Sequence, residues 1–430
     1  MKKVAIISLG CAKNLVDSEN ILGLLIKNNY EVVFKKEEAD ILIINTCGFI
    51  ESSKKESIDV ILDNINNKQK VVVTGCLVNR YVDELKKEIP EVDLWIPIRD
   101  YPRFTQLLAT LDSDIKNYEG VNDNYRMVST GNYSAYLKIG EGCSNRCTYC
   151  AIPLIRGPYV SRPFESIVNE AKHLASQGYK ELIILQQDTT RYGLDLEPKT
   201  TIVDLLKELL KIESLEYIRL LYLYPDEITD ELIELIANEE RLTPYFDIPI
   251  QHSEDRILKA MNRRGDKAYL KELFAKIRNK IPNAILRTTI MVGFPDETES
   301  DFKELMRFIE EIKFDHLGAF KYSREEGTVS YDYPHQVREA TKQKRLDALM
   351  ELQQGISYQQ NKKHIGEVMT GLVVGQENGY YLLRSYYNAP DDVDGKILFK
   401  SDKVLKEGDT VKVKILESYV YDLYGELFIQ

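Results

Sequence analysis

The chain contains 430 residues, of which 43% are hydrophobic and 29% are charged, and its formal net charge is −11. This length exceeds what one hydrophobic core usually supports, so we expect two or three domains. The acidic balance argues against a general nucleic-acid-binding protein, because such proteins are usually basic.

Nothing in the sequence predicts export or membrane insertion. Residues 1–9 combine two lysines with an apolar stretch too short for a secretory signal, and no later apolar run approaches a membrane span. We therefore expect a cytoplasmic protein with no membrane partner, in a compartment that disfavours disulfides. In such a compartment the six cysteines are expected to be metal ligands rather than partners in disulfide bridges, and the alternative is that they are buried structural thiols.

Residues 1–125 predict an amino-terminal α/β domain. Apolar runs at 3–8, 40–46 and 70–74 indicate strands, and each is followed by a helical segment. Continuous apolar strands that alternate with helices are typical of a parallel sheet covered on both faces.

Three cysteines lie just past the ends of these strands, at Cys11, Cys47 and Cys76. The carboxyl ends of parallel strands share one edge of a sheet, where ligands bind. Three thiols about thirty residues apart are therefore expected to converge, and we predict that they hold a metal cluster.

A second cysteine group is compact, with Cys143, Cys147 and Cys150 in the spacing C-x3-C-x2-C and no cysteine after them. Structural zinc and a [4Fe–4S] cluster each need four ligands. Three thiolates would leave one iron open to a substrate or cofactor. The alternative is a zinc site completed by a distant histidine, for which the candidates are His173, His252, His316, His335 and His364.

Residues 130–335 predict a central domain built as a partial parallel (β/α) barrel, because six strand-like runs alternate with amphipathic segments. Chemistry in such barrels sits at the carboxyl ends of the strands. The candidates there, nearly all polar or aromatic, are Gln186, Gln187, Asp188, Thr189, Tyr222, Tyr224, Gln251, His252, Ser253, Gly293, Phe294, Lys321 and Tyr322.

Residues 336–365 predict a linker helix, which either rests on the barrel or spans solvent. Residues 366–430 change to short strands separated by glycines, which predicts a small antiparallel β-barrel. This module carries eleven acidic and seven basic residues, for a net charge of −4.

The spacing of the second cysteine group resembles the signature of radical S-adenosylmethionine (radical SAM) enzymes, and its flanks resemble the methylthiotransferase branch. The flanks are Lys138 to Gly142 before the cysteines, then Ala151-Ile152-Pro153 and Arg156-Gly157 after them. The segments Ser8 to Glu19, Asn45 to Phe49 and Thr74 to Cys76 are similar to the amino-terminal domain of that family.

The resemblance implies that the six cysteines hold two [4Fe–4S] clusters, that S-adenosylmethionine is the cosubstrate, and that residues 366–430 form a TRAM domain. It places the ring of Tyr149 beside the open iron, where the adenine should lie. It also implies that Asp188 accepts a hydrogen bond from the methionine ammonium or from a ribose hydroxyl of S-adenosylmethionine. An electron-donor protein is an implied partner, and we expect a monomer.

Two branches of the family remain open. RimO-type enzymes modify the β-carbon of one aspartyl residue in the twelfth small-subunit ribosomal protein, and the alternative branch modifies an adenosine in tRNA. RNA binding needs phosphate neutralisation, so an acidic TRAM module disfavours RNA and suits a basic protein substrate. Residues 10–19, 160–163 and 187–193 also look like the RimO type, although Ala12 and Asp296 depart from it. A zinc-stabilised scaffold without catalysis is the hypothesis of another class.

Overall fold

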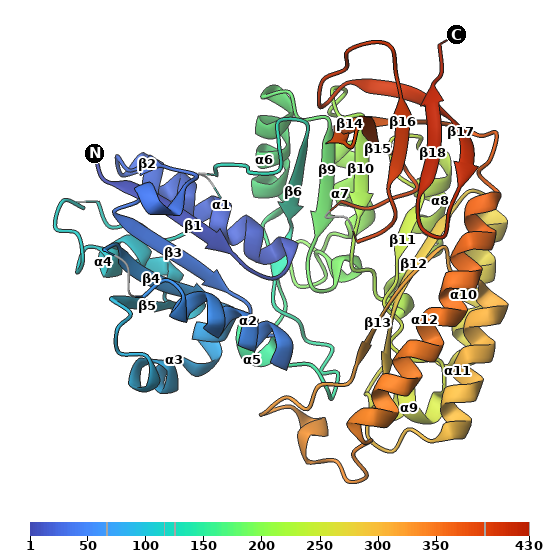
Figure 1. Cartoon of the computed structure of the whole chain (residues 1–430), viewed down its shortest axis with the longest axis horizontal. Coiled ribbons are helices and arrows are strands. Elements are labelled where there is room, and N and C mark those ends of the chain that lie inside the picture. Colours follow the sequence, from blue (N-terminus) through green and yellow to red (C-terminus); the bar gives the residue numbers. More distant parts are fainter. Residues whose placement is uncertain (66–67, 116, 124–125, 391–392, 430) are drawn as a thin grey trace.

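The computed structural model describes residues 1–65, 68–115, 117–123, 126–390 and 393–429. The predicted boundary at residue 125 and the acidic residues Asp391 and Asp392 lie outside these ranges. Figure 1 shows an amino-terminal α/β domain beside a larger body, which is formed by the strand–helix barrel and the carboxyl-terminal module.

The amino-terminal sheet has the order β2-β1-β3-β4-β5, and its pairings are all parallel. Its core forms two layers, because alternate residues of each strand point to opposite faces. Ile41 and Ile43 pack under the helices α1 and α4, whereas Leu42 and Ile44 pack under α2 and α3. The elements are β1 (Lys3–Ser8), α1 (Ala12–Lys27), β2 (Glu31–Val32), β3 (Ile41–Thr46), α2 (Glu51–Leu62), β4 (Lys70–Gly75), α3 (Cys76–Glu88), β5 (Leu94–Pro97) and α4 (Phe104–Leu108).

The central domain is an open arc of six parallel strands, as the alternating pattern predicted. It consists of two three-stranded sheets, β6-β9-β10 and β11-β12-β13, which an isolated bridge between Ile218 and Leu242 connects. The strands are β6 (Ser134–Lys138), β9 (Glu181–Leu185), β10 (Tyr217–Leu220), β11 (Tyr245–Asp247), β12 (Ile285–Val292) and β13 (His316–Lys321). The helices are α5 (Ile152–Arg156), α6 (Phe164–Ser176), α7 (Ile202–Leu209), α8 (Asp230–Asn238), α9 (Asp255–Ala260), α10 (Lys267–Lys280) and α11 (Glu299–Ile312), and a small ribbon pairs β7 (Gly140–Glu141) with β8 (Val160–Ser161).

The linker is the long helix α12 (Glu339–Lys362), and it rests on the barrel rather than crossing solvent (Figure 1). Its inner face is largely polar, and several of these side chains have partners on the barrel. Arg345 pairs with Glu297 at 2.7 Å, and Gln353 donates a hydrogen bond of 2.9 Å to the carbonyl of Phe314. These contacts explain why a helix of weak apolar periodicity is nevertheless docked.

The carboxyl-terminal module is a closed barrel in the order β14-β15-β16-β18-β17. The predicted antiparallel pairing holds except between β16 and β18, which run parallel because β17 intervenes in the chain and pairs on the far side of β18. Its strands are β14 (Val368–Glu377), β15 (Tyr380–Arg384), β16 (Ile397–Lys400), β17 (Thr410–Ser418) and β18 (Leu423–Leu427). In the described part of the chain, no helix is both long and apolar enough to cross a membrane.

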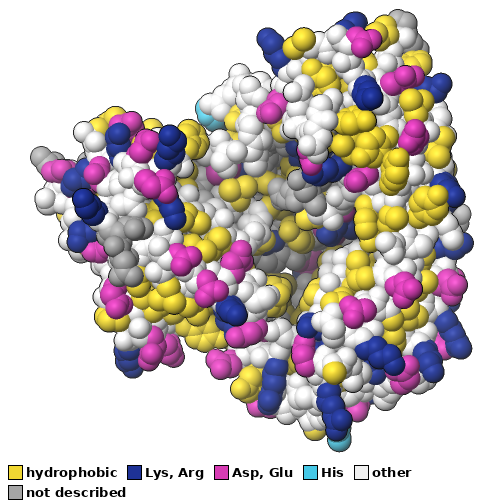
Figure 2. Space-filling view, viewed as in Figure 1, with side chains coloured by type: hydrophobic (Ala, Val, Ile, Leu, Met, Phe, Trp, Pro, Cys, Tyr) yellow, Lys and Arg dark blue, Asp and Glu magenta, His cyan; other side chains and the backbone are white. Residues whose placement is uncertain are grey.

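The module caps the amino ends of the barrel strands. Arg219 of β10 donates a 2.6 Å hydrogen bond to the carbonyl of Ser385, and Arg287 of β12 pairs with Asp394 at 3.3 Å. The opposite end of the arc, where the strands terminate, faces α1 of the amino-terminal domain. Figure 2 shows the surface hollowed between these two bodies.

Candidate metal centres and their surroundings

The amino-terminal cysteines follow three adjacent strands that end level with one another. Ser8 of β1 pairs with Asn45 of β3, and Asn45 pairs with Thr74 of β4. Cys11 precedes α1, Cys47 follows β3 directly, and Cys76 opens α3. The structure therefore brings the three predicted ligands to one edge of the sheet.

The thiols of this group are close neighbours. A Cβ at Gly10 would lie 3.0 Å from the Sγ of Cys47, so only glycine leaves that sulfur its place next to Cys11. Burial, helped by negative charge on Cys11 and Cys47, raises the pKa of the Cys76 thiol to about 11 even though Arg156 acts to lower it. Such thiols stay protonated alone and become thiolates when a metal binds them.

Asn14 ties the cysteine loops together. Its Nδ2 donates 2.9 Å hydrogen bonds to the carbonyls of Leu9 and Thr46, and its Oδ1 accepts one of 3.4 Å from the Cys76 thiol. Sequence reasoning missed this residue. Its signal was present, because a buried asparagine in the first turn of a helix needs partners beyond that helix.

The second group lies in the loop after β6. The amide of Cys150 donates a 3.0 Å hydrogen bond to the carbonyl of Cys147, and Gly142 precedes the loop with φ +71°. A side chain at Gly142 would reach within 2.0 Å of the Pro158 carbonyl. The three thiols share one short loop, and burial together with charge on Cys147 and Cys143 raises the pKa of Cys150.

Tyr149 packs inward among aromatic side chains, edge-on to Phe294 at 6.5 Å between ring centroids. Its hydroxyl accepts a 3.2 Å hydrogen bond from Arg263. Arg263 also reaches within 4.0 Å of the Cys147 sulfur and stacks on Tyr224, whose hydroxyl is 3.7 Å from the same sulfur. The sequence analysis overlooked Arg263, which lies more than a hundred positions from the cysteines it serves.

Asp188 faces the same loop. Its carboxylate accepts 2.7 Å hydrogen bonds from Asn145, between the first two cysteines, and from Thr190. Burial raises the pKa of this carboxyl. Asp188 thus lies where a cofactor beside the cysteines would meet it, and its role toward that cofactor stays a prediction.

Several buried polar atoms at the carboxyl ends of the strands have no hydrogen-bond partner among the described residues. They are both amide atoms of Gln186, the Oε1 atoms of Gln187 and Gln251, and the Oγ of Ser253. Buried polar groups normally have partners, so unmet ones indicate a ligand. A polar cosubstrate such as S-adenosylmethionine fits them.

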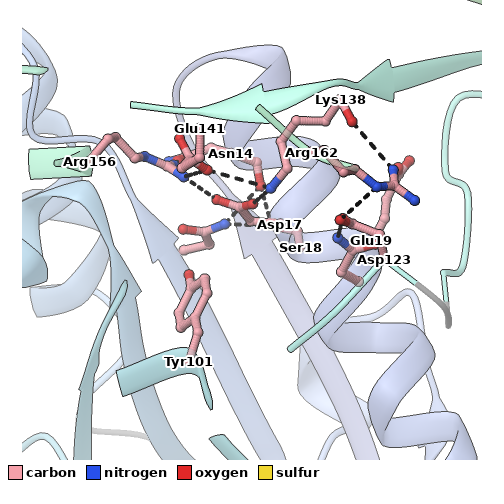
Figure 3. A network of polar contacts seen from close by, with 12 residues as sticks. Asn14, Asp17, Ser18, Glu19, Tyr101, Asp123, Lys138, Glu141, Arg156 and Arg162 are labelled. Carbon is pink, nitrogen blue, oxygen red and sulfur yellow. Dashed lines mark hydrogen bonds and ion pairs between the residues drawn. The ribbon is translucent and has the colours of Figure 1, made fainter. Parts of the chain in front are cut away.

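The two cysteine groups lie on the same side of the molecule. Cys76 packs in one apolar cluster with Ala151 and Ile155, which directly follow the second group. Arg156 crosses from that segment to the amino-terminal domain, where it contacts Asp17 at 2.6 Å (Figure 3). Its guanidinium also lies 3.4 Å from the Cys76 sulfur.

Arg156 belongs to a buried network that spans the domain boundary (Figure 3). It pairs with Glu141 at 3.1 Å, and Lys138 pairs with Asp17 at 2.7 Å. Burial opposes the ionised form of Glu141, but Arg156 and Lys138 lower its pKa to about 2. The network therefore favours the ionised form of Glu141 and places two cations against two acidic side chains across the boundary.

The zinc alternative gains no support from the described residues. Within the described part of the chain, no group of three or more His, Cys, Asp or Glu side chains is arranged to hold a single metal ion. Thiolates on a [4Fe–4S] cluster bind different irons and lie farther apart than the ligands of one ion. His252, for example, accepts a 3.0 Å hydrogen bond from the amide of Glu254, and its Nε2 lies 3.7 Å from Glu297.

Three family models match the chain. The radical SAM superfamily matches residues 137–309, an uncharacterized family, UPF0004, matches residues 3–97, and the TRAM domain matches residues 365–428. The fold and these matches define an enzyme of the radical SAM superfamily, with S-adenosylmethionine and an iron–sulfur cluster as cofactors.

Curated relatives narrow the class. The ribosomal protein uS12 methylthiotransferase RimO of Alkaliphilus oremlandii is 48% identical over 99% of both chains, and that of Clostridioides difficile is 47% identical over the full length of both. The chain belongs to the RimO family of radical SAM methylthiotransferases, which confirms the predicted resemblance.

Solved structures agree on the fold. The radical SAM methyltransferase TsrM from Kitasatospora setae superposes with a TM-score of 0.54 at 14% identity, covering 89% of this chain and 80% of its own. The cobalamin-dependent S-adenosylmethionine radical enzyme OxsB superposes with a TM-score of 0.52 at 13% identity, covering 83% of this chain and 56% of its own. These likenesses support the arrangement of an α/β domain beside a partial barrel.

Proposed function

We propose that this protein transfers a methylthio group to the β-carbon of an aspartyl residue of ribosomal protein uS12. The observation that carries the proposal is the full-length identity of about one half to RimO enzymes. The names of these relatives do not favour the alternative, a tRNA adenosine methylthiotransferase.

We propose two [4Fe–4S] clusters, one on Cys11, Cys47 and Cys76 and the other on Cys143, Cys147 and Cys150. One trio at a single edge of the sheet and the other in one short loop support this count. When bound, the clusters and S-adenosylmethionine supply the redox chemistry that removes hydrogen from a non-acidic carbon and delivers sulfur and methyl.

The chain's own residues position these groups and exclude water. Arg156 balances the charge of the Cys76 thiolate, and Arg263 does the same for Cys147. Gln186, Gln251 and Ser253 offer unmet polar atoms to S-adenosylmethionine, with Tyr149 and Asp188 beside them.

Mass spectrometry of uS12 tests the substrate. A strain that lacks this gene should contain uS12 without the methylthio mass, and the gene restored in trans should return it. Thiolated adenosine in tRNA from the same strains should not change. Loss from tRNA, with uS12 unaffected, would replace this proposal by the alternative.

Metal content and two cysteine variants test the two clusters. Anaerobically purified protein should contain about eight irons. Cys147→Ala should abolish cleavage of S-adenosylmethionine, whereas Cys47→Ala should retain cleavage and lose sulfur insertion. Full thiolated product from Cys47→Ala would disprove the assignment of the amino-terminal trio.

The acidic carboxyl-terminal module supports a basic protein substrate rather than RNA. We further propose a monomer that receives electrons from a donor protein in the cytoplasm. The six free cysteines support a reducing compartment.

A further inference from the structure

We propose that Lys13 binds the carboxylate of the target aspartyl side chain. Lys13 is the second residue of α1, two positions after Cys11. The inference rests on the proposed function, and it adds a recognition residue that neither cysteine motif contains.

The first turn of α1 packs into the mouth of the barrel. Ala12 and Val16 share one apolar cluster with Leu185 and Leu221, which lie at the carboxyl ends of β9 and β10. This docking carries Lys13 inward, so that only 6% of it is exposed. The lysine therefore comes from one domain and serves the site of the other.

The ammonium group of Lys13 lies over an aromatic platform. Its Nζ is 3.8 Å from the centroid of the Tyr222 ring, which attracts a cation. Tyr222 follows β10 with φ +60°, an uncommon conformation for a bulky residue. Its amide donates a 3.0 Å hydrogen bond to Asp247 and its carbonyl accepts one from Thr189, so the platform is fixed.

The acidic groups that face Lys13 already have other partners. They are Cys11, Glu141 and Asp247. Glu141 pairs with Arg156 and Lys138, and Asp247 pairs with Arg287 at 2.8 Å. Cys11 is the proposed iron ligand.

Among the described residues, no carboxylate forms an ion pair with Lys13. A buried lysine without an ion-pair partner is costly to keep charged, so an anion that enters the barrel mouth would be stabilised by pairing with it. The anion must be small and must enter at the barrel mouth beside both cysteine groups. The side chain of an aspartyl residue held for modification meets these conditions.

Peptide binding tests the proposal. The probes are two fluorescent peptides that span the target region of uS12, one with the target Asp and one with Asn at that position. Anisotropy with the cluster-loaded full-length wild type should show a preference of about tenfold or more for Asp, as expected for a charge-assisted hydrogen bond. Lys13→Met should bind both peptides equally, and Lys13→Arg should keep most of the preference.

The matched control is Lys27→Met. Lys27 lies at the other end of α1 and pairs with Glu119 on the surface, so this variant should keep the full preference for Asp. Cleavage of S-adenosylmethionine without peptide should continue in Lys13→Met, which separates loss of the substrate carboxylate from loss of the cosubstrate.

Three results would overturn the inference. One is an unchanged preference for Asp in Lys13→Met. Another is loss of S-adenosylmethionine binding in that variant, which would assign the lysine to the cosubstrate carboxylate. The third needs no variant: wild type that binds both peptides equally has no carboxylate site. Wild type that binds neither peptide would instead contradict the proposed substrate, and the role of Lys13 would fall with it.

Discussion

Arg156 shows how much one side chain contributes to this molecule. It is buried, contacts a cysteine of the other domain, and pairs with Asp17 and Glu141 across the domain boundary. A buried ion network tolerates the loss of one member poorly, because the remaining charges are left without partners.

Arg156→Met should therefore lower the free energy of unfolding by about 3–5 kcal/mol. It should also release iron from the amino-terminal site, which loses the cation beside Cys76. Chemical denaturation and iron analysis measure the two effects. Arg103→Met is the control, since Arg103 forms an exposed pair with Asp100 and its loss should cost under about 1 kcal/mol. Equal stability of the two variants would show that the network is dispensable.

At this scale the sequence predicted some residues and missed others for a physical reason. The convergence of Cys11, Cys47 and Cys76 was predictable, because parallel strands end at one edge. Lys13 and Arg156 were not, because their partners come from another domain and no local periodicity encodes such a contact. Asp188 was placed at the right strand end, but its hydrogen bond to Asn145 depends on the fold of the cysteine loop.

Among the elements, the junction of β4 and α3 is the most constrained. Gly75 has φ +98°, and a Cβ there would lie 2.4 Å from the Asn45 Oδ1 and the Thr46 carbonyl. The glycine lets Cys76 begin α3 against the loop that carries Cys47.

Gly75→Ala should lower the free energy of unfolding by about 1–3 kcal/mol and reduce iron in the amino-terminal site. Cleavage of S-adenosylmethionine should persist, because the second cysteine loop is untouched. Gly355→Ala is the control: Gly355 lies in α12 with no atom within 4 Å of an added Cβ, and alanine favours a helix. Unchanged iron in Gly75→Ala would show that the junction tolerates a side chain.

Most elements followed from apolar periodicity, including the parallel sheet and the six strands of the arc. The parallel pairing of β16 and β18 did not, because strands so short and so similar carry no information about their order. The docking of α12 was left open for a related reason, since its inner face consists largely of polar groups that only the folded barrel satisfies.

For the whole molecule, the decisive feature is that the carboxyl-terminal module and the cysteine groups lie at opposite ends of the barrel strands. Asp394 anchors the module by accepting hydrogen bonds from Tyr245 at 2.6 Å and from Arg287 at 3.3 Å. Burial opposes the ionised form of Asp394, but His316 and Arg287 outweigh it and lower the pKa below its ordinary value.

A lowered pKa means that the Asp394 carboxylate stabilises the fold above its unfolded pKa of about 3.9, and that this contribution is lost as the pH falls further. Asp394→Asn should therefore lower the free energy of unfolding at pH 7 by about 1–3 kcal/mol, and the midpoint temperature should fall with it. The difference from wild type should shrink below about pH 4. Calorimetry of the metal-free chain at several pH values measures it, and a constant difference would contradict the anchoring role.

The strands at the two ends of the arc, β6 and β13, are not paired with each other within the described residues. A fully closed ring can be entered only along its axis, by a small molecule or a free chain end. An arc is not limited in this way, because its strands do not enclose the axis completely, and a bend of polypeptide can approach the strand ends while both of its own ends stay attached to a folded parent. A ribosomal protein could thus be modified without first being unfolded.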